Sequence, residues 1–443
     1  MIDIRLIREN PELVKENIKK KFQDDKLPLV DKVAKKDIEW RNFKKRLDDL
    51  RHSRNEVSKE INEAKKSKDE KKANQLLKQA KLIPKKIEET QKKTRKLESE
   101  IKEIMYKIPN IISKKTHIGK SEEDNVEIKK VGKPKKFSFP VKNHVEIAEN
   151  LNLIDFDASA KVSGNGFYYL KGKLALLNQA LIQFGIDTLI KKDYQYIEPP
   201  LMLHEKQIYA SMDKEAIEES VYPIKDEDLN LIGTAEQALL AMHTNEAIPG
   251  SKLPKRYAAY SMCFRKEIGA HGINEKGLWR THQFNKVEQF IFCKPEDSEK
   301  YYNELLKNSE EILKALELPY RIMELCSGDL ASWKHRSADL EVYRPTTNKY
   351  EEVMSLSNCT EYQARKLNIK YIDKEGNRKV LHTLNDTALA TSRIMVAILE
   401  NFQQKDGSIK IPKALWKYTG FKEIKPKPKE KKKAKNKKKS KKK

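Results

Sequence analysis

Two stretches near the N-terminus repeat apolar residues at alternating steps of three and four positions. The first stretch contains Trp40, Phe43, Leu47, Leu50, Val57, Ile61 and Ala64, with Arg54 at its one irregular position. The second contains Leu76, Ala80, Ile83, Ile87, Thr90, Thr94, Leu97, Ile101 and Ile104. This heptad pattern is typical of a coiled coil, and the polar segment 65–75 predicts the turn between two helices. We therefore expect an antiparallel α-helical hairpin, with a kink or a helix restart at Pro84, because proline disrupts a helix interior.

After this hairpin the pattern becomes mixed. Residues 108–125 predict a linker, which begins beside the helix-breaking Pro109. Residues 173–192 predict an amphipathic helix, and residues 194–203 predict a strand that ends with two prolines. Residues 260–290 predict an antiparallel β-hairpin, because two strand-like pieces flank a loop rich in glycine and charge. Helices and strands in this irregular order predict an α+β fold.

Charge divides the chain further. The net charge is +25, and residues 31–108 hold 25 Lys and Arg against 15 Asp and Glu, a surplus of +10. Residues 422–443 hold 14 Lys and two Glu, a surplus of +12, so the middle of the chain is almost neutral. Basic appendages favour a polyanionic partner such as nucleic acid, whereas the plainer alternatives are a solvated spacer and a solubility tail. We expect a hairpin domain at 1–115, a globular domain at 116–421 and a disordered Lys-rich tail at 422–443.

Several classes of protein are excluded by what the sequence lacks. The longest apolar run, 394–399, is too short for a membrane span, and the charged N-terminal residues do not form a signal peptide. The four cysteines, Cys263, Cys293, Cys326 and Cys359, form no CxxC pair, which argues against zinc and favours free thiols in the cytoplasm. Neither GxxxxGK[ST] nor GxGxxG occurs, so the P-loop and Rossmann phosphate sites are excluded.

The stretch 280–292 has an unusual composition for a strand. Alternation places Arg280, His282, Phe284, Lys286, Glu288 and Phe290 on one face. A hydrophobic core does not suit this face, and a solvated face does not need two phenylalanines. Together with Arg265 and Glu267 on the preceding strand, it offers arginines for phosphates, a ring for a base and carboxylates for amines. Taken singly, each residue is equally consistent with a salt bridge or with packing.

These residues lie in segments that resemble a known family. The pattern "FRKE…GLWRTHQFNKVEQF" closely resembles motif 2 of class II aminoacyl-tRNA synthetases, in the form found in seryl-tRNA synthetases. Residues 384–403 resemble motif 3 of the same enzymes, 233–243 resemble their TxE loop, and 350–371 resemble the strand that holds metal and ATP. The resemblance covers essentially residues 1–420 and implies a coiled-coil hairpin followed by a catalytic domain with a mixed, mainly antiparallel β-sheet flanked by helices.

The resemblance also implies roles for individual residues. Arg265, Arg280 and Arg393 are the implied catalytic residues. The implied serine-binding residues are Thr234, Ala235, Glu236, Arg265, Glu288, Asn385 and Thr387. The implied ATP-binding residues are Arg265, Lys266, Glu267, Arg280, Thr281, Phe284, Glu352, Val353, Met354, Ser355 and Arg393. Glu352 and Ser355 are implied to hold Mg²⁺ with the phosphates, and no zinc is implied.

The implied activity is formation of seryl-adenylate from serine and ATP, followed by transfer of serine to tRNA(Ser) bound by the coiled-coil arm. Transfer to tRNA(Sec), a non-charging paralogue that binds nucleotide or RNA, and a class II enzyme for another amino acid stay open. The resemblance also implies a homodimer, with 173–203 at its interface. One departure concerns Ile273, Asn274 and Glu275, which lack the basic residues common in relatives. This departure puts contacts with the tRNA acceptor stem in doubt, but not ATP binding.

Overall fold

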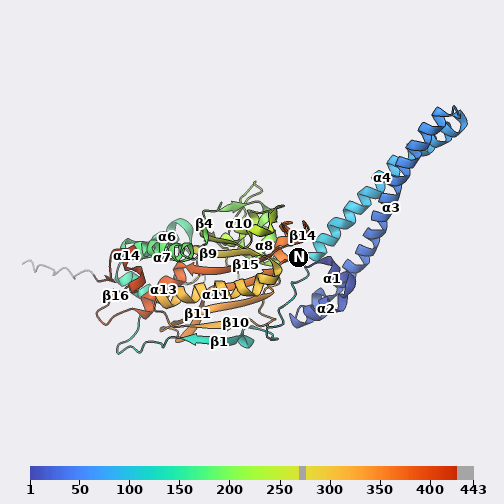
Figure 1. Cartoon of the computed structure of the whole chain (residues 1–443). Helices are drawn as coiled ribbons and strands as arrows, with labels where there is room; N and C mark the ends of the chain where they lie inside the picture. Colours follow the sequence, from blue (N-terminus) through green and yellow to red (C-terminus); the bar gives the residue numbers. More distant parts are fainter. Residues whose placement is uncertain (269–275, 427–443) are drawn as a thin grey trace, which may run out of the picture.

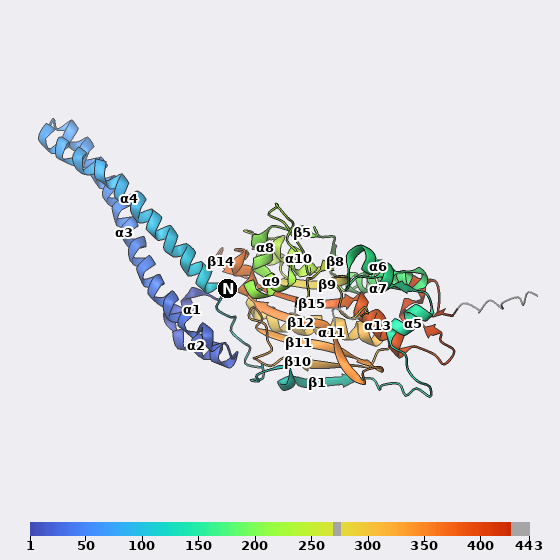
Figure 2. The same ribbon diagram turned by 180° about the vertical axis from the view of Figure 1, so that it is seen from behind.

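The N-terminal helical hairpin is present and stands apart from the rest of the molecule. The computed structural model describes residues 1–268 and 276–426. Helices α3 (Leu27–Lys66) and α4 (Glu70–Met105) pack along each other and project from the body, as Figures 1 and 2 show. The turn occupies only residues 67–69 of the segment 65–75. Most seam positions of α4 are buried, whereas the intervening charged residues are exposed. The predicted coiled-coil hairpin, called the arm below, is confirmed.

Of the kink or helix restart expected at Pro84, the restart is wrong, because α4 continues through this residue without interruption, and the kink stays a prediction. Pro84 is exposed while the preceding Ile83 is buried in the seam. Packing of α4 against α3 holds the turns around Pro84 in register.

A compact helical base connects the arm to the body. It contains α1 (Ile4–Glu9), α2 (Pro11–Lys20) and η1 (Asp24–Lys26), which lie beside the lower ends of α3 and α4 in Figure 1. Val14 and Ile18 of α2 are fully buried in one apolar cluster with Ile104 of α4. Tyr362 of the body belongs to the same cluster, so the base and the body share a core.

An eight-stranded sheet forms the centre of the body. All of its neighbouring strands are antiparallel except β4 and β8, which are parallel. In spatial order the strands are β1 (Val126–Val131), β10 (Tyr320–Glu324), β11 (Arg336–Arg344), β12 (Lys349–Thr360), β15 (His382–Ala390), β9 (Gln283–Cys293), β8 (Lys255–Phe264) and β4 (Gln195–Ile197). The mixed, mainly antiparallel sheet expected for the catalytic domain is confirmed.

Small sheets and short helices surround this centre. A three-stranded sheet joins β14 (Arg378–Val380), β13 (Lys370–Ile372) and β7 (Ala247–Pro249). The two-stranded sheets pair β2 (Ile154–Asp155) with β3 (Tyr169–Leu170), β5 (Met202–Leu203) with β6 (Asn230–Leu231), and β16 (Ile409–Lys410) with β17 (Glu423–Ile424). The remaining helices are α5 (His144–Asn150), α6 (Phe156–Ser163), α7 (Gly172–Ile190), α8 (Glu205–Ser211), α9 (Lys214–Ser220), α10 (Ala235–Ala241), α11 (Ser298–Ala315), α12 (Tyr362–Lys366), α13 (Thr391–Asn401) and α14 (Trp416–Thr419). Short 3₁₀ turns are η2 (Glu122–Asp124), η3 (Gly250–Lys252), η4 (Pro295–Asp297) and η5 (Lys413–Leu415).

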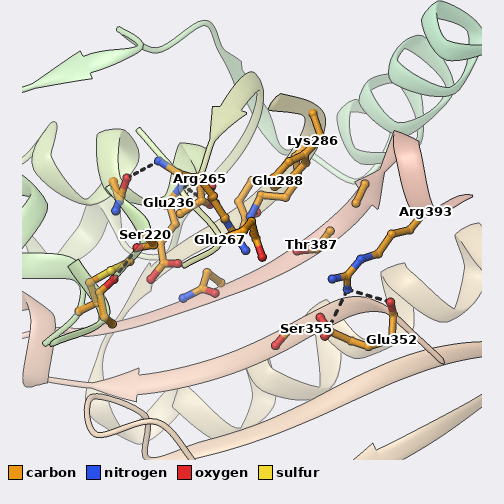
Figure 3. Close-up of a pocket in the computed structure, with 18 of the residues that line it drawn as sticks. Ser220, Glu236, Arg265, Glu267, Lys286, Glu288, Glu352, Ser355, Thr387 and Arg393 are labelled. Atoms are coloured by element: carbon orange, nitrogen blue, oxygen red, sulfur yellow. Dashed lines mark hydrogen bonds and ion pairs between the residues drawn. The ribbon is translucent and has the colours of Figure 1, made fainter. Parts of the chain in front are cut away.

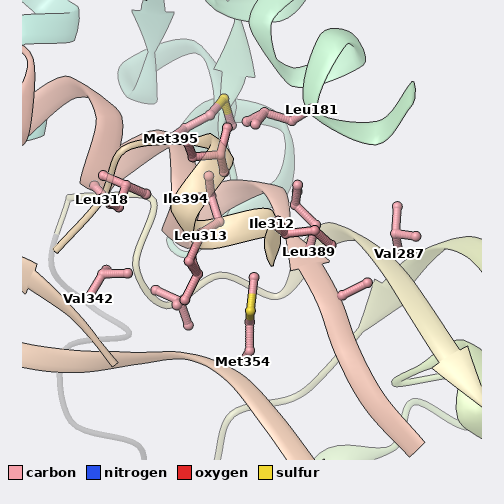
Figure 4. Packing of buried hydrophobic residues seen from close by; sticks show 14 of the residues in the cluster. Leu181, Val287, Ile312, Leu313, Leu318, Val342, Met354, Leu389, Ile394 and Met395 are labelled. Atoms are coloured by element: carbon pink, nitrogen blue, oxygen red, sulfur yellow. The ribbon is translucent and has the colours of Figure 1, made fainter. Parts of the chain in front are cut away.

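The main hydrophobic core lies where α7, α11 and α13 meet the sheet. Figure 4 shows Leu181 of α7, Ile312 of α11 and Met395 of α13 against strand residues such as Leu389. The predicted helix at 173–192 corresponds to α7. The predicted strand at 194–203 is wrong as a single element, because Pro199 and Pro200 separate β4 and β5, which belong to different sheets.

The predicted hairpin is formed by β8 and β9, but β9 begins only at Gln283. Arg280, Thr281 and His282 therefore precede the strand, and the main-chain N–H of His282 donates to Gly166 O, outside the sheet. Phe290 corrects a second expectation: it is fully buried in a smaller core with Leu239 of α10, so one end of this strand face does enter a hydrophobic core.

The linker prediction for 108–125 is confirmed, since this segment contains no regular element apart from η2. The four cysteines are buried and free. Among the described residues, no helix combines the length and the apolar character needed to span a bilayer. The expectations for Ile273, Asn274 and Glu275, and for most of the Lys-rich tail, concern positions outside the described residues.

Candidate active site

A cavity of about 690 Å³ opens above the middle of the sheet, between β9, β12, β15 and α13. Most of the residues singled out from the sequence line it, although they come from distant parts of the chain. These residues are Thr234, Glu236, Arg265, Glu267, Arg280, Thr281, Phe284, Glu288, Glu352, Val353, Ser355, Asn385, Thr387 and Arg393. Figure 3 shows the acidic group around Glu236 and Glu288 at one end and Arg393 with Glu352 at the other.

Three expected residues do not line the cavity. Ala235 is buried in the core beneath α10, and Met354 is buried in the main core. Lys266 follows Arg265 with its side chain outside the cavity lining, and its main-chain N–H donates to Ser220 O. Since neighbouring residues of extended chain point to opposite sides, a run of consecutive residues does not share one face.

A bulge explains how Glu352 and Ser355, three positions apart, both reach the cavity. Along β11 and β12, Leu340 is paired with Met354 but the next residue, Glu341, is paired with Glu352. Val353 is therefore an extra residue in β12, and the bulge breaks the strict alternation that would place Glu352 and Ser355 on opposite faces.

The floor of the cavity is the charged face of β9. Phe284, Lys286 and Glu288 lie on it, and Lys286 Nζ is 2.7 Å from Glu288 Oε2. Both of these charged side chains are almost completely buried. Above the floor, the guanidinium carbon of Arg265 lies 5.2 Å from the centre of the Phe284 ring, and Arg265 Nε donates to Gly233 O at 3.1 Å. This arrangement places a cation and an aromatic plane side by side.

A second carboxylate, that of Glu236, lies at the acidic end. Thr234 caps α10 by accepting from the main-chain N–H of Glu236, and Gln363 Nε2 donates to Glu236 Oε1 at 2.7 Å. Burial raises the pKa of Glu236, and the negative charge of Glu288 raises it further. A ligand ammonium placed between the two carboxylates would relieve this repulsion.

Hydroxyl and amide groups from β15 complete the acidic end. Asn385 and Thr387 lie on the strand that neighbours β9, with Thr387 paired to Glu288. Asn385 Nδ2 is buried and has no hydrogen-bond partner among the described residues. An unpaired buried donor is costly, so a ligand acceptor at this position would be favourable.

The opposite end of the cavity is rich in cations. Arg393 Nη1 donates to Glu352 O at 2.9 Å and lies 3.2 Å from Glu352 Oε2. The guanidinium carbons of Arg393 and Arg344 lie 5.5 and 4.5 Å from the centre of the Trp279 ring. Burial raises the pKa of Glu352, but the cations around it, Arg393 first, outweigh burial and lower it. Arg280 Nη1 donates to Glu267 Oε2 at 3.1 Å. Guanidinium groups in this position suit phosphate oxygens.

Several lining residues were not predicted as site residues. Lys286 had a detectable signal, because it alternates with Phe284 and Glu288 on the same strand. Trp333 and Lys334 had none, since they lie in an irregular loop between β10 and β11. Lys334 Nζ is 3.4 Å from Ser355 Oγ and 3.1 Å from Ser337 Oγ. Gln363, which holds Glu236, was also missed.

Models of two protein families match the chain. The seryl-tRNA synthetase N-terminal domain matches residues 1–112, and the class II tRNA synthetase core domain of the Gly, His, Pro, Ser and Thr enzymes matches residues 221–402. Within residues 1–268 and 276–426, no group of three or more His, Cys, Asp or Glu side chains is placed to bind a metal ion.

Named relatives extend over nearly the whole chain. Serine–tRNA ligases of Pyrococcus abyssi and Pyrococcus furiosus are 43% and 44% identical to it, covering 96% of this chain and 98% of each relative. That of Methanospirillum hungatei is 43% identical, covering 96% of this chain and all of the relative.

Solved structures agree with the sequence relatives. Seryl-tRNA synthetase of Pyrococcus horikoshii, crystallised with ATP, has a TM-score of 0.90 and 41% identity, covering 97% of this chain and 100% of that one. The cytoplasmic serine–tRNA ligase of Naegleria fowleri, solved with AMP, has a TM-score of 0.85 and 32% identity, covering 97% and 99%. Matches at this identity and coverage leave one assignment: the chain belongs to the seryl-tRNA synthetase family.

Proposed function

We propose that this protein joins serine to tRNA(Ser) in two steps at the cavity, using ATP. The observation that carries the proposal is that one cavity brings together the carboxylates of Glu236 and Glu288 and several arginine side chains. Serine needs carboxylates for its ammonium group, and ATP needs guanidinium groups for its phosphates. Relatives named for serine, and crystal structures of relatives with ATP or AMP, support the same substrates.

At the acidic end, we assign the serine ammonium to Glu236 and Glu288, and the serine hydroxyl and carboxylate to Asn385, Thr387 and Thr234. A site built around a hydroxyl discriminates against alanine, because its buried polar groups would then lack partners. Threonine, which has one more methyl group than serine, must be excluded by size.

For ATP, we assign the α-phosphate to Arg265, the outer phosphates to Arg280, and the nucleotide to Arg393 and Phe284, with the adenine amine at Glu267. Thr281 and Val353 line the same cavity. Lys266 and Met354, which do not line the cavity, are left out of the ATP contacts, as Ala235 is left out of the serine contacts.

Magnesium bound with ATP fits the residues present. Glu352 and Ser355 supply hard oxygen donors, and Asp339 Oδ1 beside them is buried without a hydrogen-bond partner among the described residues. Burial, together with the charge of Glu352, raises the pKa of Asp339 to about 7. When bound at Glu352 and Ser355, Mg²⁺ would neutralise negative charge on the phosphate oxygens.

In the first step, a carboxylate oxygen of serine attacks the α-phosphorus, and the bond to the bridging oxygen breaks to release pyrophosphate. Arg265 and Arg280 stabilise the charge that develops on the phosphates. In the second step, the 3′-hydroxyl of the terminal tRNA adenosine attacks the adenylate carbonyl, and the bond from the carbonyl carbon to the phosphate oxygen breaks. AMP leaves, and its phosphate oxygen takes the proton of the hydroxyl group. The first step needs no side chain as a base, because the attacking group is a carboxylate. The two ends of the cavity therefore supply much of the acceleration by positioning serine and ATP.

We assign tRNA binding to the arm, whose surface carries the basic surplus. A variant that combines Lys44→Glu, Lys45→Glu, Lys85→Glu and Lys86→Glu, all at exposed positions, should bind tRNA more weakly. The dependence of tRNA binding on salt concentration should also become flatter. The tRNA-independent first step should be unchanged in this variant. Equal tRNA affinity in wild type and variant would exclude this part of the arm as the tRNA-binding surface. Aminoacylation of tRNA(Sec) can be measured with the same preparations.

We further propose a homodimer, a cytoplasmic location and the domain division 1–115, 116–421 and 422–443. Large apolar side chains of α7, Leu176 and Ile190, are about half exposed, which suits an interface. The Naegleria relative is named as cytoplasmic. Sedimentation of the wild-type protein tests the dimer directly.

Serine-dependent exchange of pyrophosphate into ATP tests the activity. Exchange should occur with serine and not with threonine, with alanine or without an amino acid. Glu236→Gln should raise the KM for serine at least about tenfold, because it removes a charged acceptor, whereas Glu218→Gln on the exposed surface of α9 should have no effect. Folded protein that binds ATP but shows no exchange with any amino acid would favour a non-charging paralogue instead.

A further inference from the structure

One wall of the cavity is held by the helical base of the arm. This wall is the segment 330–335, an irregular part of the chain that carries Trp333 and Lys334 into the cavity lining. Lys21, which ends α2, reaches across from the base: its Nζ donates to Leu330 O at 2.8 Å and to Ala331 O at 3.2 Å. The active-site wall is therefore anchored by a residue more than 300 positions away in the sequence.

The burial of Lys21 shows that this anchor is a specific part of the fold. Its side chain is 2% exposed, and its hydrogen-bond acceptors are two main-chain carbonyls instead of a carboxylate. Burial lowers the pKa of Lys21 to about 7, and the charges of Lys26 and Lys334 add to this effect while Asp213 opposes it.

The linker holds the same segment from a second side. The main-chain N–H of Asn110 donates to Ser332 O at 2.7 Å, and Asn110 Nδ2 donates to Trp333 O at 3.0 Å. The main-chain N–H of Ser113 donates to His335 O at 2.8 Å. Main-chain carbonyls from 330 to 333 are thus bonded to the N-terminal part of the chain, so the segment has little freedom to move by itself.

On its other side the segment acts on the cavity. Trp333 packs against the apolar cluster of the base and also lines the cavity. Lys334 lies beside Ser355, and its charge lowers the pKa of both Glu236 and Glu352. A shift of the segment would move one ammonium group relative to both the serine end and the phosphate end.

We propose that Lys21 is a positioning residue for serine activation, because it fixes segment 330–335 and thereby places Lys334 next to Ser355 between the two ends of the cavity. The inference rests on the proposed function for the meaning of the two ends. Lys21 touches neither substrate and acts through the main chain of Leu330 and Ala331.

The experiment compares Lys21→Met with Lys20→Met, its exposed neighbour on α2, in full-length protein without tRNA. Lys21→Met should lower kcat/KM for pyrophosphate exchange by about ten- to a hundredfold, mainly through a higher KM for ATP, because small misplacements of active-site groups have effects of this size. The active-site concentration, measured by the adenylate burst, and tRNA binding should match the wild type. Lys20→Met should be unchanged in every assay.

A double-mutant cycle separates positioning from simple destabilisation. If Lys21 acts through Lys334, Lys21→Met should have little further effect on the KM for ATP in a Lys334→Met background. The proposal would be overturned if the effects of Lys21→Met and Lys334→Met on the KM for ATP multiplied fully in the double variant. It would also be overturned if Lys21→Met lowered kcat only in proportion to the active-site concentration and left KM unchanged. Lys21→Gln, which keeps a shorter donor, serves if Lys21→Met does not fold.

Calorimetric binding of ATP provides a readout that does not need catalysis. Wild-type protein that binds ATP but shows no exchange with any amino acid would overturn the proposed function alone. In that case weaker ATP binding by Lys21→Met than by Lys20→Met would still support the positioning role. Equal ATP binding by both variants would overturn the positioning role, whatever the exchange assay shows.

Discussion

The arm and the catalytic cavity place their charged residues in opposite environments. In the arm, apolar seam residues such as Leu97 are buried while most charged residues face water, and the ion pair between Lys36 and Glu100 is partly exposed. In the cavity and the body around it, charges are buried in pairs: Lys286 with Glu288, and Arg344 with Glu400. The charges of the arm act mainly at its surface, whereas a buried ion pair in the body depends on both of its members.

This difference predicts how each region tolerates substitution. Loss of one partner from an exposed ion pair changes the free energy of unfolding little, because water replaces the lost partner. Loss of one partner from a buried pair leaves an uncompensated charge, which is strongly destabilising. Matched substitutions in the two regions therefore measure how far the contrast holds.

The largest effect is expected for Lys286→Met. It leaves Glu288 buried without its cation, which should lower the free energy of unfolding by about 3–5 kcal/mol in denaturant titration. Serine should restore part of this loss, since its ammonium would take the place of the missing cation, so serine should raise the Tm of the variant more than that of the wild type. The matched change in the arm, Lys36→Met, should leave stability unchanged. Equal losses in the two variants would refute the contrast.

The next effect concerns Glu400, behind the cationic end of the cavity. Its carboxylate is fully buried and accepts from Arg344 Nη2 at 2.8 Å and from Thr346 Oγ1 at 2.7 Å. Burial raises the pKa of Glu400, but hydrogen bonds from His144 and Arg344 outweigh burial and lower it to about 2. A lowered pKa means that the folded protein binds this proton less readily than the unfolded chain does.

The sign of the pH dependence follows. Glu400 should stabilise the protein by about 3 kcal/mol above its unfolded pKa of roughly 4.5, and this stability should be lost as the pH falls towards 2. Glu400→Gln should remove this part of the acid dependence, seen as a flatter plot of unfolding free energy against pH. The exposed Glu98→Gln in the arm should leave the plot unchanged. An unchanged acid dependence in Glu400→Gln would show that other carboxylates dominate.

The two regions also differ in how much of their structure could be predicted from the sequence, because their residues are buried in different patterns. One period of apolar residues specifies the whole arm, because only the seam is buried. Alternation alone likewise predicts that Phe284 and Glu288 share one face of β9, because both lie within the regular part of the strand. Resemblance to the family then supplied most of the cavity residues, including Glu236 and Arg393, which no period connects.

The remaining features depend on contacts that no local pattern encodes. The bulge at Val353 sets the direction of Glu352, and irregular chain brings Trp333 and Lys334 to the cavity. The sequence pattern predicts that β9 begins at Arg280, but the strand begins at Gln283. The prediction is wrong there because the alternating pattern continues beyond the part of the strand that is paired with β8. Gln363 reaches Glu236 from a short helix whose sequence shows no sign of the contact.

A smaller and local effect is expected in the arm at Pro84. Pro84→Ala restores a main-chain N–H in the middle of α4 and should stabilise that helix by up to about 3 kcal/mol. Hydrogen exchange should slow in the turns around residue 84 and stay the same in β9 and β15. Lys85→Ala, next to it and also exposed, is the control and should have almost no effect. Slower exchange in the body as well would mean that the arm and the body unfold together.

The smallest effect is expected for the removal of one methyl group near the tip of the arm. Ile61 is 8% exposed and packs in a small cluster with Ala64, Ala73 and Leu76. Ile61→Val should cost about 1 kcal/mol or less, because the narrow seam lies next to solvent and relaxes around the lost group. Ile394→Val, in the fully buried core of α13, should cost more, up to about 1.5 kcal/mol, because its neighbours are fixed on every side. A larger loss at Ile61 than at Ile394 would show that the arm, despite its exposed charges, is packed as tightly as the catalytic core.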